Sequence, residues 1–394
     1  MTRAQQNYIF FIILFMIPLS GIGVDIYMPS LPAIHHYFAA PASLVKLTLA
    51  IYTACYGIGQ LFTGTLSDTF GRKKVLLTSL IIYLIITFCI TRAGSIGWLL
   101  GLRALQGLAI SSAGTITRAL ITDSFEGLAR KKVANWMTIC WALGPIVAPF
   151  IGGYLQVSFG WQASFYFLMG YGFLLFLFVC FAKETNPYRH PLEIRHIANN
   201  YRKVLSHGLF WAAVLVLTLY CAAIYIFNVL GPFIIQVELH HSPVFYGHMA
   251  LLLGICWFAG NVLNRIVISH NKVNLAVAIA SSIAAFASIA IIIFGVSHWL
   301  SVPTAIIPVG IILLFAGMVF PNAMGLCLSL FPEMAGSASA IAGTLFIALA
   351  SIVSAIASFL KSESLLPMGI LYTVITVVAA LIYWCILRRY WQKA

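Results

Sequence analysis

The sequence predicts an all-α, polytopic membrane protein with twelve transmembrane helices in two pseudo-symmetric six-helix bundles. Three observations predict this fold: the composition, a series of long apolar segments, and one long polar interruption in the middle of the chain. Of the 394 residues, 62% are hydrophobic and only 8% are charged, whereas a soluble domain carries about 25% charged residues. The composition therefore excludes a soluble globular fold.

The apolar segments are long enough to cross a bilayer, which requires about 20 residues per helix. Segmentation on this basis predicts twelve spans, at 8–33, 46–65, 75–93, 97–120, 133–157, 162–182, 209–236, 246–268, 274–296, 302–330, 336–360 and 367–388. We expect the first span to stay uncleaved, because it lacks a small-residue cleavage site.

The polar interruption predicts the domain organisation. The segment 183–208 separates six spans from six, and we expect it to be a cytoplasmic linker between an N-terminal bundle, 1–182, and a C-terminal bundle, 209–394. A faint repeat supports two related halves: GTLSD at 64–68 resembles GNVLNR at 260–265, 196 residues later, with Asn264 in place of the acid. Repeated six-helix halves place a substrate site at their interface near the bilayer midplane.

The net charge of +13 is a signal of topology. Of the 22 Lys and Arg residues, 17 fall in the termini and alternate loops on one side, three (Lys46, Arg92 and Lys361) fall on the other side, and Arg103 and Arg118 lie within the fourth span. By the positive-inside rule both termini are cytoplasmic, which requires an even number of spans. This placement of charge argues against nucleic acid as a partner.

Asp25 is the only carboxylate predicted inside a span, because the other eight Asp and Glu residues fall in loops or at span ends. A charge at membrane depth is costly and usually serves proton coupling or substrate pairing. The alternative is a carboxylate with a structural hydrogen-bonding role.

The segment GTLSDTFGRKK at 64–74 joins the second and third spans. Its glycines permit a tight cytoplasmic turn. Asp68 is expected to pair with a nearby Arg or to cap the next helix, which would make a latch that opens and closes. The alternative is a solvated basic loop that serves topology alone.

This segment resembles the loop 2–3 signature of the major facilitator superfamily. The longer stretch 45–77 resembles the bicyclomycin-resistance (Bcr/CflA-type) branch of its drug:proton antiporters. Further matches are DIYMPSLP at 25–32, LRALQG at 102–107, APFIGG at 148–153, FPNAM at 320–324 and AGSASAIAGTL at 335–345. The resemblance implies a proton-coupled exporter of small amphipathic compounds that works by alternating access.

The resemblance also assigns roles to residues. Asp25 and Arg103 match the proton-coupling positions, and Gln106 and Gly107 complete the motif around Arg103. Arg103 and Gln106 share one helix face, which is expected to look into a cavity. The proton affinity of Asp25 must then change as the cavity alternates. Arg103 could instead be a structural charge held by backbone carbonyls, and Arg118 could simply snorkel to the cytoplasmic surface.

Two motifs match the gating and export elements of that family. The gating residues in loop 2–3 are Gly64, Asp68, Gly71, Arg72 and Lys73. The antiporter motif in the fifth span comprises Gly144, Pro145, Pro149, Gly152 and Gly153. Pro and Gly predict a bent, closely packed helix. Ala148 stands where the family pattern has Gly, and an ordinary Pro-kinked helix is the alternative.

Polar and aromatic residues at membrane depth are candidates for the substrate cavity. They are Tyr27, Tyr52, Gln60, Gln106, Phe227, Asn228, Asn261 and Asn322. Each could equally form hydrogen bonds between helices. The pairs His35-His36 and His240-His241 follow the first and seventh spans, and they are either solvated or sensitive to pH or a metal chelate.

The sequence predicts no cofactor and no metal site. The eight Cys are scattered without a C-x-x-C pair, and no phosphate-binding loop occurs. No catalytic constellation indicates an enzyme. The expected partners are a small-molecule substrate, protons and the lipid bilayer of the bacterial inner membrane, and the resemblance implies a monomer. The main alternative is a dedicated carrier, exporting or importing one metabolite such as a siderophore, a sugar or an amino-acid-like compound.

Overall fold

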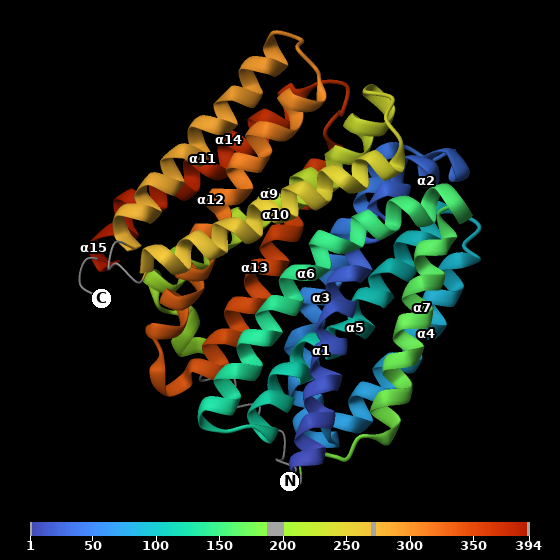
Figure 1. Cartoon of the computed structure of the whole chain (residues 1–394), viewed down its shortest axis with the longest axis vertical. Coiled ribbons are helices and arrows are strands. Elements are labelled where there is room, and N and C mark those ends of the chain that lie inside the picture. The colour runs from blue at the N-terminus through green and yellow to red at the C-terminus, as the bar shows by residue number, and fades with distance from the viewer. Residues whose placement is uncertain (1, 187–200, 269–272, 392–394) are drawn as a thin grey trace. The chain divides into compact units, whose positions relative to one another are not determined.

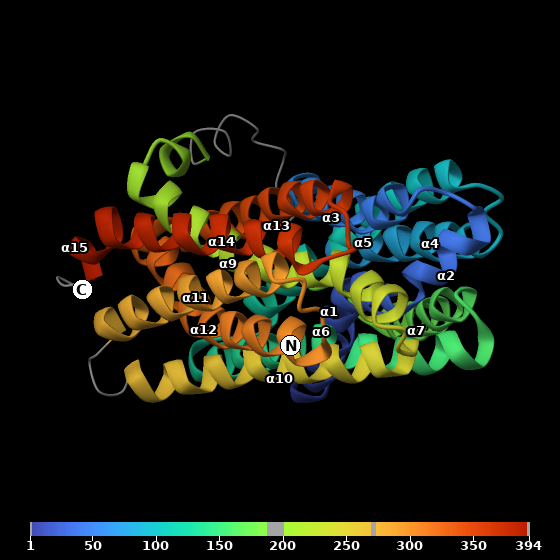
Figure 2. The ribbon, with the colours of Figure 1, turned by 90° about the horizontal axis from the view of Figure 1, so that it is seen from above.

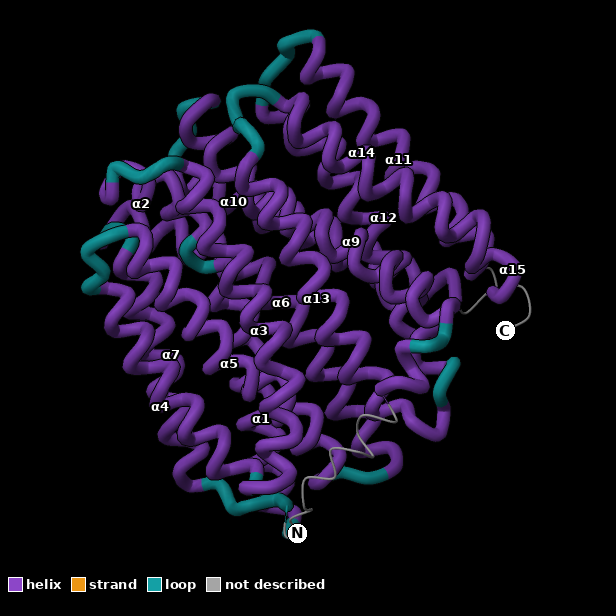
Figure 3. Tube along the Cα trace, turned by 180° about the vertical axis from the view of Figure 1, so that it is seen from behind, coloured by secondary structure: helices purple, strands orange, loops and turns teal. Residues whose placement is uncertain are grey.

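The computed structural model describes residues 2–186, 201–268 and 273–391. Within these ranges the chain is helical and contains no strand (Figure 3). It divides into two compact units, Met1–Ile194 and Arg195–Ala394. The predicted all-α class is confirmed, because eleven helices of the described part are long and apolar enough to cross a membrane. The predicted span 133–157 lies on a further helix, Gly127–Phe159, which is not among these eleven.

The first unit runs from blue to green in Figure 1. Its elements are α1 (Arg3–Asp25), a 3-10 turn (Met28–Ser30), α2 (Leu31–Phe38), α3 (Ala42–Phe70), α4 (Arg72–Thr91), α5 (Ile96–Ser124), α6 (Gly127–Phe159) and α7 (Gln162–Phe181).

The second unit begins its described part at residue 201. Its elements are α9 (Gly208–Phe233), a π-helical turn (Ile234–Glu238), α10 (Pro243–Ile268), α11 (Val273–Val296), α12 (Val302–Ser329), a 3-10 turn (Pro332–Met334), α13 (Ala335–Phe359), α14 (Leu365–Ile382), a second π-helical turn (Tyr383–Leu387) and α15 (Arg388–Trp391). Helix α11 lies alongside α12 and α14 (Figure 2). Gly369 of α14 permits the close contact between α14 and α11, since a Cβ there would stand 2.8 Å from the Ile292 nitrogen.

The first predicted span is not one continuous helix. Helix α1 ends at Asp25, and the chain passes through a 3-10 turn before α2. Pro29 and Pro32 cause the interruption, because proline lacks the N–H of the helical ladder and restricts the preceding residue. The consequence is that Asp25 stands at a helix end, within the predicted first span.

The turn between the second and third predicted spans is shorter than the sequence predicts. Helix α3 continues through Asp68 to Phe70, and Gly71 alone makes the turn with φ of +96°. Gly64 therefore lies inside α3, where its role is packing: a Cβ there would stand 3.3 Å from the Thr115 side chain. Most of the predicted linker, residues 187–200, lies outside the described residues, and the predicted domain boundaries stay predictions.

Candidate functional site

A fully buried polar cluster in the first unit is built around Arg103. Helix α5 carries Arg103 and Gln106 one turn apart, and both are 0% exposed. The Arg103 guanidinium donates hydrogen bonds to Gln106 Oε1 at 2.5 Å and to the Gly23 carbonyl at 3.1 Å. These two bonds tie α5 to the last turn of α1.

Two tyrosine rings enclose the guanidinium. The Arg103 Cζ atom lies 4.4 Å from the centre of the Tyr27 ring and 4.1 Å from that of Tyr52. The Tyr52 hydroxyl donates to the Ser20 carbonyl at 3.3 Å, and Gly23 leaves the space for it, since a Cβ there would stand 3.2 Å from Tyr52 Cζ. Cation–π contacts of this kind strengthen when the cation is removed from water.

Asp25 lies beside this cluster. It is 4% exposed and stands two residues after the carbonyl that Arg103 binds. It also interacts electrostatically with Tyr27. The hydrogen bonds of Arg103 to the Gln106 amide and the Gly23 carbonyl hold the guanidinium beside the end of α1 that carries Asp25. That Asp25 and Arg103 act together in proton coupling stays a prediction.

The fifth-span motif lies against the broken end of α1. A Cβ on Gly152 would stand 2.8 Å from the Ile26 carbonyl carbon, and one on Gly144 would stand 3.8 Å from the Ile22 nitrogen. Ser164 of α7 donates to the same Ile26 carbonyl at 3.3 Å. Glycine at 152 therefore lets the α6 backbone touch the residue that follows Asp25.

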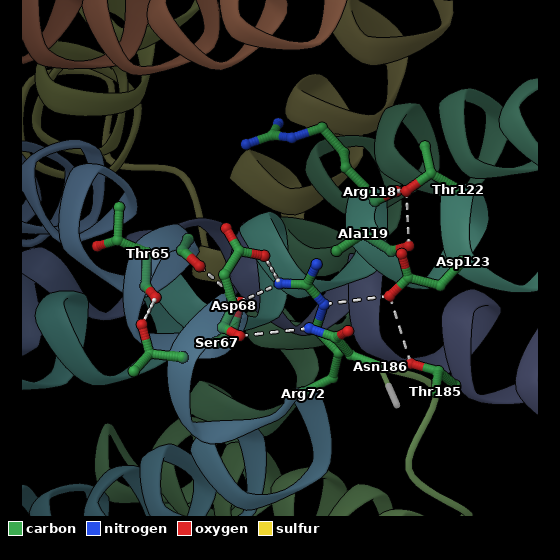
Figure 4. A network of polar contacts seen from close by, with 12 residues as sticks. Thr65, Ser67, Asp68, Arg72, Arg118, Ala119, Thr122, Asp123, Thr185 and Asn186 are labelled. Atoms are coloured by element: carbon green, nitrogen blue, oxygen red, sulfur yellow. Dashed lines mark hydrogen bonds and ion pairs between the residues drawn. The ribbon is translucent and has the colours of Figure 1, made fainter. Parts of the chain in front are cut away.

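The gating motif forms an ionic network at the other end of the unit (Figure 4). Arg72 pairs with Asp68 one turn earlier and with Asp123 Oδ2 of α5 at 3.1 Å. It also donates to Ser67 Oγ at 2.7 Å. Of the two roles expected for Asp68, the structure shows the pairing with arginine. One guanidinium thus joins α3, α4 and α5.

The cap of α4 comes from Glu184, which follows α7. Its carboxylate accepts the backbone N–H of Arg72 at 3.0 Å and of Lys73 at 3.1 Å. Lys73 Nζ in turn donates to the Cys180 carbonyl at 2.7 Å. A carboxylate at a helix N-terminus satisfies orphan donors and favours the helix dipole. The end of α7 is therefore fastened to the gating motif.

Comparison with known proteins identifies the family. Residues 13–355 match the sequence profile described as Major Facilitator Superfamily. The chain belongs to the major facilitator superfamily. It is a multi-pass membrane transporter that carries small molecules, and it is not an enzyme.

Similar proteins agree with this assignment. A bicyclomycin resistance protein homolog of Haemophilus influenzae is 27% identical over 410 residues, which covers 99% of this chain and 98% of that protein. Multidrug resistance protein D of Escherichia coli is 23% identical over 387 residues, with 95% and 94% covered. The crystal structure of a D-xylose–proton symporter shares the fold with a TM-score of 0.75 at 16% identity, with 96% and 97% covered. The superfamily and the likeness to drug-resistance transporters predicted from the motifs are confirmed.

The predicted cavity residues of the first unit fall into two groups within this superfamily fold. Tyr27, Tyr52 and Gln106 surround Arg103, whereas Gln60 binds a different cation, accepting a hydrogen bond from Arg118 at 2.6 Å.

Those of the second unit are spread over three helices. Phe227 stacks on Tyr246 with ring centres 5.9 Å apart, and Asn228 follows it on α9. Asn261 donates to the Trp257 carbonyl at 3.0 Å, and Asn322 donates to Asn264 at 2.7 Å. The last bond joins α10 to α12 at the residue that replaces the acid of the repeated motif. Their contact with substrate stays a prediction.

The histidine pairs lie at element ends. His35 and His36 form the last turn of α2, and His35 Nδ1 lies 2.5 Å from the Ala40 carbonyl oxygen. His240 adopts a left-handed backbone with φ of +55°, and the His241 ring stacks on Phe245. Whether these pairs respond to pH or to a metal chelate stays a prediction.

Sequence reasoning missed four polar residues. Asp123 and Glu184 were counted only as acids at span ends, and Thr87 carried no signal at all. Lys46, which the charge placement predicts on the outer side, lies in the second turn of α3 and is 2% exposed. Its position one turn after Pro41, where a helix can start, was the available signal.

Thr87 of α4 determines which way the Gln106 amide points. The Thr87 hydroxyl donates to the Tyr83 carbonyl at 2.6 Å, so it can only accept from Gln106 Nε2 at 2.8 Å. This leaves Gln106 Oε1 for Arg103. Thr87→Val should lower the transport rate about tenfold, because a buried amide N–H loses its partner, while Thr87→Ser should restore it.

The matched control for this prediction is Thr91→Val. Thr91 lies one turn later and donates only to the Phe88 carbonyl, at 2.7 Å. The test measures the transport rates of both variants, and the pH profiles of these rates, in proteoliposomes. Equal effects of Thr87→Val and Thr91→Val would show that the loss is merely structural.

Glu184→Ala should lower the free energy of unfolding by about 1 kcal/mol, the usual cost of losing a helix cap. Thermal unfolding in detergent measures the change. Glu126→Ala is the control, since Glu126 precedes α6 without a side-chain cap bond. A melting temperature that falls no further for Glu184→Ala than for Glu126→Ala would contradict the cap.

Proposed function

We propose that this superfamily transporter is a proton-coupled antiporter that exports small amphipathic compounds across the bacterial inner membrane. It acts as a monomer with both termini in the cytoplasm and alternates access by a rocker-switch motion of its two halves. The observation that carries the proposal is the placement of Asp25, a 4% exposed carboxyl group at the broken end of α1. The drug-resistance names of its relatives support export as the direction.

The residues around Asp25 suggest how one carboxyl group could exchange a proton for substrate. A buried carboxyl group holds its proton as long as water and positive charge stay away, and it releases the proton when either approaches. Arg103 supplies a permanent positive charge, because a guanidinium keeps its proton in proteins. Movement of the α1 end relative to α5 would change the distance between the two groups, and with it the proton affinity.

Tyr52 and Gln106 hold Arg103 while the end of α1 moves, because neither residue belongs to α1. Tyr27 belongs to the interrupted segment after α1, and Tyr52 belongs to α3. A polar substrate that replaces part of this arrangement would favour the ionised carboxyl group and expel the proton. Binding of substrate and of proton then exclude each other, which is the condition for exchange.

Proton release from inside-out vesicles tests this function. Vesicles with an acidic lumen and an entrapped pH dye receive cationic dyes, chloramphenicol or ferric siderophores at the outer face. Antiport predicts that a transported compound drives protons out of the lumen. Transport that proceeds equally without a gradient, and without proton movement, would refute it. A response to a single siderophore would instead identify a dedicated carrier.

A further inference from the structure

A second cation in the first unit lies apart from the Arg103 cluster. Arg118 follows Arg103 by 15 positions on α5, which corresponds to about 22 Å along the helix at 1.5 Å per residue. Its Nη2 donates to Gln60 Oε1 of α3 at 2.6 Å. One turn away, Gly114 makes room for Tyr56, since a Cβ there would stand 3.3 Å from Tyr56 Cζ. Gln60 and Arg118 therefore face each other across the α3–α5 contact.

The charge of Arg118 is not balanced by a carboxylate in the described part of the chain. Its guanidinium has five N–H donors, and the hydrogen bond described for it goes to a neutral amide. Asp123, the acid on the same helix, is engaged by Arg72 and Thr185. Figure 4 shows the Arg118 guanidinium extending away from that network. Arg118 is partly exposed, and an arginine within a predicted span that has no opposite charge beside it is a candidate for a substrate path.

Gln60 has a donor without an acceptor. The residue is 5% exposed, its Oε1 is occupied by Arg118, and its Nε2 is buried without a hydrogen-bond partner. The orientation of this amide is fixed, because only an oxygen can face the guanidinium. The pair thus presents N–H groups only, and an unsatisfied buried donor costs about 1–3 kcal/mol. One acceptor oxygen placed here would satisfy both side chains.

We propose that Gln60 and Arg118 form a substrate-recognition subsite for an acceptor oxygen, a carbonyl or a carboxylate. This subsite rests on the proposed function, because its ligand is the transported amphipathic compound. The subsite selects against lipophilic cations, which offer no acceptor and are repelled by the guanidinium. Arg118 thus discriminates among substrates, while Asp25 and Arg103 handle the proton.

A matched series of probes tests the subsite. The full-length protein in lipid nanodiscs, without any gradient, is titrated with three dansyl compounds that share one alkyl linker. They end in a carboxylate, a primary carboxamide or a trimethylammonium group. We expect the two oxygen-bearing probes to bind at least tenfold more tightly than the cation. Equal affinity for all three would overturn the proposal.

Gln60→Glu supplies the decisive variant. A carboxylate at 60 would pair with Arg118 and fill the subsite from within, so we expect affinity for the carboxylate probe to fall about tenfold and that for the cation to rise. Gln5→Glu is the control: it adds the same charge, and it keeps the capping box that Gln5 forms with Thr2. Unchanged probe preference in Gln60→Glu, in a variant that elutes and melts like the parent, would overturn the subsite.

This binding measurement does not depend on proton coupling. If Gln60→Glu reverses the probe preference while substrate drives no proton release in the parent protein, the subsite stands and the antiport mechanism fails. If proton release occurs but the preference is insensitive to position 60, antiport stands and the subsite fails.

Discussion

Replacing Asp25 with Asn should abolish substrate-driven proton release. Asparagine has nearly the same shape and can still form hydrogen bonds, but it cannot take up or release a proton. Removal of an essential proton-transfer group typically costs a factor of about 10² or more. The measurement is proton efflux from inside-out vesicles together with binding in nanodiscs.

The control for Asp25→Asn is Glu363→Gln. Glu363 is a 70% exposed carboxylate that faces Lys361 at 3.8 Å, outside the predicted spans. The Glu363→Gln variant should transport like the parent. The Asp25→Glu variant should keep part of the proton release, because glutamate keeps an ionisable group. Normal proton release by Asp25→Asn would remove this residue from the coupling mechanism.

Gly152→Ala should be the most disruptive single-methyl change in the first unit. Its Cβ would overlap the Ile26 carbonyl group and would stand 2.8 Å from the carbonyl carbon, so backbone rather than a flexible side chain must move. Overpacking of this kind typically costs about 1–3 kcal/mol. Because Ile26 follows Asp25 directly, the shift should also impair proton-coupled transport.

Gly170→Ala is the matched control on α7, where an added Cβ meets no atom within 4 Å. It should leave both melting temperature and transport unchanged. Thermal unfolding and vesicle transport of the two variants give the comparison. A Gly152→Ala protein as stable and active as Gly170→Ala would show that α6 does not press on the end of α1.

Arg72 illustrates what a motif specifies and what it leaves open. The order of Gly, Asp and Arg indicated a latch, and Asp68 does pair with Arg72. Its partners Asp123 and Glu184 lie 51 and 112 positions later in the chain. No local pattern specifies such pairs, because they depend on where α5 and α7 end after packing.

The sequence by itself determined the all-α membrane fold and the superfamily, and it predicted Asp25 inside the first span. These properties follow from apolar length, charge placement and short motifs, which are local or additive along the chain. Prolines 29 and 32 also encoded the break after Asp25, although the apolar run concealed it.

Only the tertiary structure decided which side chains meet. Arg103 rests on Gly23 and between two tyrosines, and Gln60 turns to Arg118 rather than to the Arg103 cluster. These contacts depend on the rotation of each helix about its axis and on the level at which glycines let α1, α3, α5 and α6 touch. Close packing fixes both, and it acts between residues far apart in the sequence.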